Sequence, residues 1–141
     1  MYPPHLVAPM KADLVNVGFQ ELTTAEDVVN TMENAEGTML VVVNSVCGCA
    51  AGAARPGVKA AIEASEIKPD KLVTVFAGVD GDATAKMREF LLPYPPSSPS
   101  IALFKDGELV HFIERHHIEG RSAGMIAQHL EMAFEEFCEK A

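Results

Sequence analysis

The chain has 141 residues, the size of one domain, and 48% hydrophobic against 22% charged residues, a balance typical of a globular protein with a core. A net charge of −9 argues against binding to nucleic acid or anionic lipid driven by electrostatic attraction. The longest purely apolar run covers residues 39–43, too short for a membrane-spanning helix. The N-terminus has no basic start followed by an apolar run, which argues against a secretory signal.

The first 36 residues are predicted to form two helices that precede the core. In the first helix, apolar residues recur at helical spacing and Gly18 follows as a stop signal. Those apolar residues are Leu6, Met10, Leu14 and Val17. Thr23 or Thr24 caps the second helix, which ends before Gly37. We interpret residues 1–36 as a helical extension of a single domain that covers residues 1–141.

Residues 37–141 are predicted to alternate between strands and helices. The β-branched run at 39–43 has no polar break and predicts a strand that is buried on both faces. A helix ending near Ser65 follows it, and Pro56 must lie in the first turn of that helix or kink it. The remaining elements are a strand at 72–77, a helix at 82–92, strands at 100–104 and 108–113, and a helix from Ser122 whose apolar face comprises Met125, Ile126, Leu130, Ala133, Phe134 and Phe137.

The predicted order β-α-β-α-β-β-α is that of the thioredoxin core. A strand–helix–strand unit implies a right-handed parallel crossover, and the turn at Asp106-Gly107 predicts an antiparallel hairpin. The fold class is therefore α/β: a thioredoxin-like mixed sheet with helices on both faces and two extra N-terminal helices. The strand at 39–43 is then central, and its carboxyl end is where open α/β sheets bind ligands.

Cys47 and Cys49 flank Gly48 at that strand end and are the strongest candidates for chemistry. Only a thiolate attacks disulfides efficiently, and the N-terminus of a helix lowers a thiol pKa. Cys47 lies nearer the strand and is the predicted nucleophile, whereas Cys49 is predicted to sit deeper and to act as a possible resolving thiol. Gly48 would let the backbone fold tightly between the two sulfurs. The third cysteine, Cys138, is predicted to be a peripheral thiol.

Two other interpretations of the cysteines remain open. A Cys-x-Cys pair supplies two thiolates for a metal ion, and Cys138 or the pair His116 and His117 could complete a tetrahedral set. No second close cysteine pair is present, so no metal site is predicted. Buried, inert thiols are the other alternative.

Pro99 is predicted to face Cys47 across the site. It would open the strand at 100–104, which we expect to lie antiparallel beside the first core strand. A cis Ser98–Pro99 bond would leave the backbone of Ser98 free to pair with the main chain of a substrate. The alternative is a trans turn with no role.

The cysteine region resembles the signature of the bacilliredoxins. The resemblance rests on VVVNSVCGCAAG at residues 41–52, followed by Arg55 and Pro56. Later segments also resemble the family: TVFAG at 74–78, ATAKMRE at 83–89, PSSPS at 96–100, and HFI at 111–113 with Arg115 and His116. Together they cover about residues 7–138, and the extended cysteine block is far more specific than Cys-x-Cys alone.

The resemblance implies a thioredoxin-like fold and cytoplasmic thiol–disulfide exchange. Members of the family remove bacillithiol from S-bacillithiolated proteins, and disulfide-isomerase activity has also been described. By the match, Cys47 would attack the mixed disulfide and take up bacillithiol, and a second bacillithiol or Cys49 would release it. The expected partners are S-bacillithiolated proteins and low-molecular-weight thiols, with bacillithiol as co-substrate and no bound cofactor. A homodimer is left open.

Three further residues are candidate substrate contacts. Arg55 could pair with a carboxylate of a low-molecular-weight thiol, or it could be a structural or solvated arginine. Asn44 and Ser45 could hydrogen-bond near the reactive sulfur, or they could merely shape the turn.

Two alternative functions remain open for the protein as a whole. One is a general protein disulfide isomerase or oxidant, and the other is a non-enzymatic metal-binding or redox-sensing module.

Overall fold

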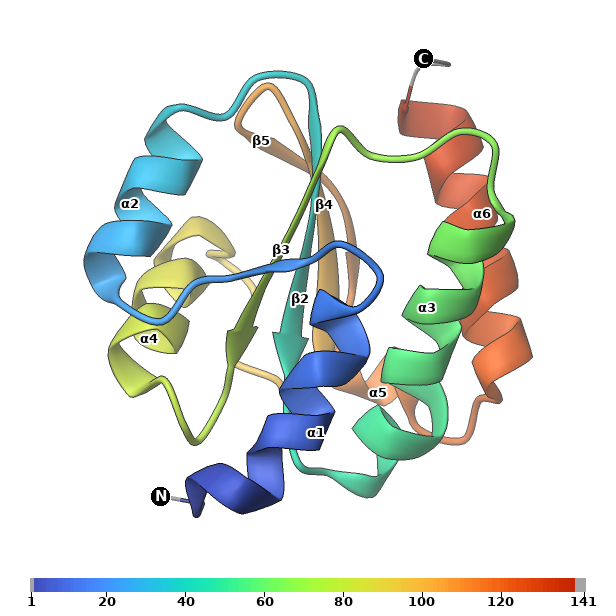
Figure 1. Cartoon of the computed structure of the whole chain (residues 1–141). Helices are drawn as coiled ribbons and strands as arrows, with labels where there is room; N and C mark the ends of the chain where they lie inside the picture. Colours follow the sequence, from blue (N-terminus) through green and yellow to red (C-terminus); the bar gives the residue numbers. More distant parts are fainter. Residues whose placement is uncertain (1, 139–141) are drawn as a thin grey trace.

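Within residues 2–138, which the computed structural model describes, five strands form one mixed sheet (Figure 1). They are β1 (Gln20–Glu21), β2 (Thr38–Asn44), β3 (Lys71–Phe76), β4 (Ser100–Lys105) and β5 (Glu108–Ile113). The strand order is β1-β3-β2-β4-β5. The pairs β1–β3 and β2–β3 are parallel, and the pairs β2–β4 and β4–β5 are antiparallel. The prediction that the first core strand, β2, is central is confirmed.

Helices cover both faces of this sheet (Figure 1). They are α1 (Pro4–Val15), α2 (Ala25–Glu33), α3 (Arg55–Ala64), α4 (Gly81–Phe90), α5 (Arg115–Ile118) and α6 (Ala123–Phe137), with a π-helical turn η1 (Ala50–Ala54) before α3. Helices α2 and α4 pack on one face, and α1, α3 and α6 pack on the other. No helix in the described part of the chain is long and apolar enough to cross a membrane.

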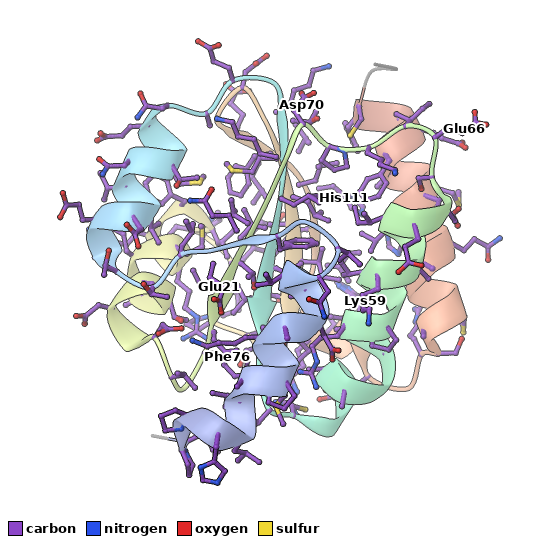
Figure 2. The ribbon with its side chains drawn as sticks, in the orientation of Figure 1. Glu21, Lys59, Glu66, Asp70, Phe76 and His111 are labelled. Carbon is purple, nitrogen blue, oxygen red and sulfur yellow. The ribbon has the colours of Figure 1, made fainter. Side chains whose placement is uncertain are left out.

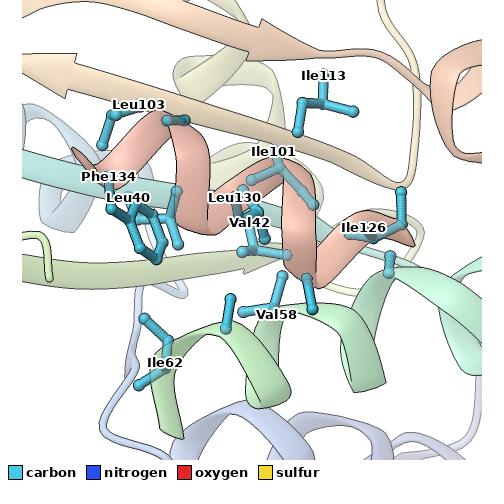
Figure 3. Close-up of a cluster of buried hydrophobic side chains, with 14 of the residues drawn as sticks. Leu40, Val42, Val58, Ile62, Ile101, Leu103, Ile113, Ile126, Leu130 and Phe134 are labelled. Carbon is cyan, nitrogen blue, oxygen red and sulfur yellow. The ribbon is translucent and has the colours of Figure 1, made fainter. Parts of the chain in front are cut away.

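The β2 strand is buried on both faces, as its unbroken β-branched run predicts. Because side chains alternate along a strand, Leu40 and Val42 join the core cluster under α3 and α6 (Figure 3). Val41 and Val43 join the opposite cluster under α2 and α4. Apolar packing on both sides therefore holds β2 in place, and with it the segment that follows its carboxyl end.

The N-terminal extension differs from the prediction in two ways. Helix α1 is anchored through Val7 and Leu14, which are buried, whereas Leu6 is 44% exposed. The extension also contributes the strand β1, which pairs with β3 through Gln20 and Glu21. Both β1 side chains are exposed, so no alternation of apolar residues marks this strand in the sequence.

The last helix confirms the predicted apolar face except at one position. Ile126, Leu130 and Phe134 are fully buried, but Met125 is 50% exposed. Consecutive residues on a helix differ by about 100° in direction, so the stripe that contains Ile126 turns its neighbour Met125 outward. The four-residue helix α5, which precedes α6, was not predicted.

Candidate active site

Cys47 lies at the junction between sheet and helix, as predicted. The β2 strand ends at Asn44, and helical backbone begins at Gly48. The carbonyl of Cys47 accepts hydrogen bonds from the N–H groups of Ala50 at 3.0 Å and Ala51 at 3.2 Å. The side chains of Cys47 and Cys49 are partly exposed, so a disulfide substrate can reach them.

The helix after the cysteines starts with a π-helical turn, and Pro56 explains its position. In η1 the N–H of Arg55 donates to the carbonyl of Ala50, five residues earlier. Pro56 follows as the second residue of α3, and because it has no N–H to donate to a carbonyl one turn earlier, the helical hydrogen-bond pattern has to change near it. Because helical backbone runs from Gly48 through η1 into α3, Pro56 lies inside the helix rather than in its first turn, and the other predicted outcome, a local distortion, takes the form of this wider turn.

The two sulfurs at the junction are in direct contact. The Sγ atoms of Cys47 and Cys49 lie 2.7 Å apart, within hydrogen-bonding distance, and both cysteines are free. The hydrogen bond from the Cys49 thiol lowers the pKa of Cys47, and burial partly opposes this effect. The backbone N–H groups of Cys49 and Ala50 and the charge of Arg115 lower the pKa of Cys47 further. Cys47 is therefore the more readily ionised thiol of the pair.

Cys49 has the opposite electrostatics. Burial raises the pKa of Cys49, and the hydrogen bond and negative charge of Cys47 raise it further. When one of the two thiols ionises, Cys47 loses its proton more readily, and the Cys49 thiol can donate a hydrogen bond to the resulting anion. The roles of Cys47 as the attacking thiol and Cys49 as the resolving thiol stay a prediction.

A buried hydrogen-bond network fixes the turn that leads to Cys47. Asn44 Oδ1 accepts hydrogen bonds from the Ser45 N–H at 2.9 Å and from Arg55 Nη1 at 3.0 Å. The same Nη1 donates to the Ser45 carbonyl at 2.7 Å. Ser45 Oγ then accepts a hydrogen bond from the Cys47 N–H at 3.1 Å. Asn44 and Ser45 are both buried, so the structure assigns them to shaping the turn.

Arg55 does not face the substrate side, which corrects its predicted contact with a carboxylate. Its side chain is only 4% exposed, and its guanidinium points inward to the turn. Its Nε lies 3.4 Å from a carboxylate oxygen of Asp13 on α1, and Lys59 lies 3.7 Å from the other oxygen of that group. Arg55 therefore joins α1 to the turn before Cys47, and its burial keeps its guanidinium from a carboxylate of a substrate.

Helix α1 is also tied to the carboxyl ends of the strands by Lys11. Its ammonium lies 2.9 Å from Asp80, 3.8 Å from Glu21 and 5.9 Å from the centre of the Phe76 ring. Figure 2 labels Glu21 and Phe76 beside α1. The Asn44 side chain adds a hydrogen bond to the Met10 carbonyl at 3.2 Å. The N-terminal helix is thus part of the support of the site.

The loop before β4 lies across from the cysteines, as predicted. The Ser98–Pro99 peptide bond is cis. Val43, near the end of β2, pairs with Ser100 at the start of β4, which brings this loop to the same end of the sheet as Cys47. Pro99 is buried and Ser98 is partly exposed. The Ser98 carbonyl accepts a hydrogen bond from Arg115 Nη1 at 3.3 Å, so its backbone is not wholly free.

Arg115 is a site residue that the sequence interpretation did not single out. It is the first residue of α5, directly after β5, and its charge lowers the pKa of both Cys47 and Cys49. Its backbone N–H donates to Ser97 Oγ at 3.5 Å, and its Nε pairs with Glu119 at 2.6 Å. The signal that could have found it is its position after the hairpin, since β5 returns to the end of the sheet where β2 terminates.

Gly48 is not required for the conformation predicted for it. A Cβ atom at this position would have no neighbour within 4 Å, and its φ is not in the left-handed region. Gly48 is exposed, so the absence of a side chain instead leaves the space beside the two sulfurs open to a substrate.

The remaining cysteine and histidines do not assemble around Cys47 and Cys49. Burial raises the pKa of Cys138, and a hydrogen bond with Thr38 partly opposes this effect. Thr38 is the first residue of β2, and the length of that strand, roughly 20 Å, separates it from the turn that contains Cys47. His117 accepts a hydrogen bond from the Glu114 N–H at 3.2 Å and belongs to the cap of α5. Within residues 2–138, no group of three or more Cys, His, Asp or Glu side chains is arranged to hold a metal ion.

Comparison with known proteins places this geometry in a family. The family model described as "Disulphide isomerase" matches residues 2–138. A bacilliredoxin of Cytophaga hutchinsonii is 65% identical, with 96% of this chain and 99% of the relative aligned. A bacilliredoxin of Bacillus cereus is 59% identical over 97% of this chain and 95% of the relative.

Solved structures confirm the fold. Mitochondrial thioredoxin 3 of Saccharomyces cerevisiae, in its oxidised form, gives a TM-score of 0.58 at 16% identity, over 88% of this chain and 98% of that one. Thioredoxin O2 of Arabidopsis thaliana, also oxidised, gives 0.56 at 14% identity, over 88% of this chain and 97% of that one.

A thioredoxin-like sheet with two free cysteines in contact beyond its central strand, in a chain matched nearly end to end by bacilliredoxins, defines a thiol–disulfide oxidoreductase. The alignment with the relatives is nearly end to end. The chain belongs to the bacilliredoxin family.

Proposed function

We propose that this protein removes bacillithiol from S-bacillithiolated proteins. The observation that carries the proposal is the asymmetry of the thiol pair: the Cys47 and Cys49 sulfurs lie 2.7 Å apart, and the pKa of Cys47 is lowered whereas that of Cys49 is raised. The naming of the relatives as bacilliredoxins supports the choice of bacillithiol. We place the reaction in the cytoplasm, where free thiols persist.

In the first step the Cys47 thiolate attacks the bacillithiol sulfur of the mixed disulfide. A bond forms between the two sulfurs, the bond to the client cysteine breaks, and the client leaves as a thiolate that takes a proton from water. The product is a reduced client protein and a bacillithiol mixed disulfide on Cys47.

The second step can follow either of two routes. A second bacillithiol thiolate attacks the bound bacillithiol sulfur, which releases bacillithiol disulfide and restores the Cys47 thiolate. Alternatively, Cys49 loses its proton and attacks Cys47 Sγ, which releases reduced bacillithiol and forms a Cys47–Cys49 disulfide. A low-molecular-weight thiol must then reduce that disulfide in a two-electron exchange.

A general protein disulfide isomerase is the second candidate, because the matching family model carries that description. Both activities need an accessible nucleophile at Cys47, so cysteine variants alone do not separate them. The two activities are separated by measuring whether the protein reacts faster with a bacillithiol adduct or with a scrambled protein disulfide.

The test is mass spectrometry after exposure to a bacillithiolated model protein and to bacillithiol disulfide. We expect one bacillithiol adduct on Cys47 in Cys49→Ala, no adduct in Cys47→Ala, and wild-type turnover in the matched control Cys138→Ala. The client thiol released from the model protein is counted directly. Client release by Cys47→Ala, or equal rates on a scrambled protein without preference for bacillithiol adducts, would overturn the proposal.

A further inference from the structure

Arg115 carries an exposed positive charge at the end of the sheet where Cys47 and Cys49 lie. Its side chain is 45% exposed, and Nη1 is held at 3.3 Å from the Ser98 carbonyl in the loop before Pro99. The backbone pairing explains its place. Ile113, the last residue of β5, pairs with Ile101 of β4, which brings the start of α5 to the sheet end where Cys47 lies.

The positive charge of Arg115 lies on a protein whose net charge is strongly negative. The chain carries a net charge of −9, so its overall field disfavours the approach of an anion. Arg55, the other arginine near the turn, is buried and directed to Asn44 and Ser45. Arg115 instead lowers the pKa of both thiols, which places its charge within electrostatic reach of the reacting sulfurs.

The contacts of Arg115 leave part of its guanidinium available. The Nε donates to Glu119 at 2.6 Å, and Nη1 donates to Ser98 at 3.3 Å. The remaining N–H groups of the planar guanidinium have no partner among these contacts. An arginine held in this way binds a carboxylate with directed hydrogen bonds, and Glu119 partly offsets its charge.

We infer that Arg115 is a specificity-determining residue that binds a carboxylate of the thiol joined to Cys47, so that the site prefers anionic thiol adducts. This inference rests on the proposed function, which it deepens by assigning the charge of the substrate. The contact with a carboxylate that the sequence interpretation considered for Arg55 is thus assigned to Arg115, at the start of α5. Glu119 holds the guanidinium and tunes the strength of the preference.

The test uses three small disulfides with similar chains and different charges. They are the dianion of 3,3′-dithiodipropionate, neutral bis(2-hydroxyethyl) disulfide and dicationic cystamine. In a Cys49→Ala background, Cys47 attacks each one and retains half of it as a mixed disulfide, while the other half leaves as a thiolate. The rate constant for each charged disulfide is divided by that for the neutral one, which cancels any change in the fraction of Cys47 that is ionised.

We expect Arg115→Gln to lower the anionic-to-neutral ratio about fivefold, the size of one exposed charge pair, and to raise the cationic-to-neutral ratio. Arg115→Lys should retain most of the anionic preference, and Glu119→Gln should increase it. Added salt should shrink the ratio in the parent protein and leave Arg115→Gln almost unchanged.

An equal loss of rate on all three disulfides in Arg115→Gln would overturn the inference, because Arg115 would then act only on the Cys47 thiolate. A decrease of the anionic ratio in Glu119→Gln would also overturn it. The probes contain no bacillithiol, so failure of the proposed function can be recognised separately. In that case no bacillithiol adduct would form on Cys47, while the charge ratios would still depend on Arg115.

Discussion

Replacement of Arg55 by methionine tests the buried network that supports the turn before Cys47. The change removes two hydrogen bonds from a charged donor, to Asn44 Oδ1 at 3.0 Å and to the Ser45 carbonyl at 2.7 Å. Such bonds contribute about 1.5–3 kcal/mol each. Relief of the cost of burying a cation offsets part of this loss, so we expect a net destabilisation of about 2 kcal/mol.

Thermal unfolding measures this effect directly. For a chain of this length, about 2 kcal/mol corresponds to a decrease in Tm of roughly 7 °C. The matched control is Lys59→Met, because Lys59 is paired to the same Asp13 carboxylate but is 35% exposed. An exposed pair contributes less than about 1 kcal/mol, so the control should shift Tm by no more than roughly 3 °C.

The Arg55 variant should also slow attack by Cys47, because Ser45 Oγ holds the Cys47 N–H at 3.1 Å and Ser45 would lose the Arg55 contact. The assay is the rate of reaction with a neutral disulfide. Equal Tm values for Arg55→Met and Lys59→Met would refute this account of Arg55, as would an unchanged rate in a destabilised Arg55→Met protein.

Two other predictions concern the packing of α3 on α6 and a pair of histidines. Gly57→Ala should destabilise the protein by about 1 kcal/mol in chemical unfolding, because the new Cβ would lie 2.7 Å from Ile126 and the strain exceeds the gain in helix propensity. In contrast, Gly124→Ala, whose Cβ has its nearest neighbour at 3.9 Å, should stabilise it by up to about 1 kcal/mol; the reverse order would show that the helices are not in close contact. Burial lowers the pKa of His129, and the nearby His111 lowers it further, so protons bind preferentially to the unfolded chain. The contribution of His129 to the free energy of unfolding should therefore be fully present above about pH 6.5 and should be lost as the pH falls through the lowered pKa. Unfolding curves measured across this pH range should show a shallower loss of stability in His129→Gln than in the parent protein. Identical slopes in the two proteins would contradict the assignment.

The central elements could be predicted because their causes are local in the sequence. The β-branched run of β2 and the Asp106-Gly107 turn between β4 and β5 specify strands and a hairpin without reference to distant residues. The cysteine junction followed from these elements. The two-residue strand β1 could not be predicted in this way, since it exists only through its pairing with β3.

The candidate site was predictable in its nucleophile and less so in its charges. Charged residues are usually exposed, so no local pattern indicated that Arg55 would be buried against Asn44 and Ser45. Arg115 gained its position from the register of two antiparallel strand pairs, which is a property of the folded sheet. Contacts between residues that are distant in the sequence become visible only in the folded structure.

The most direct test of the account is the pH dependence of alkylation at each cysteine of the reduced protein. Iodoacetamide is added for a fixed short time across a range of pH, and peptide mass spectrometry counts the product on Cys47 and Cys49 separately. We predict modification of Cys47 with a midpoint below the ordinary pKa of a thiol, a Cys49 that reacts only at higher pH, and an upward shift of the Cys47 midpoint in Cys49→Ala, which removes the largest cause of the lowered pKa. Preferential modification of Cys49, or a Cys47 midpoint that is unchanged in Cys49→Ala, would contradict it.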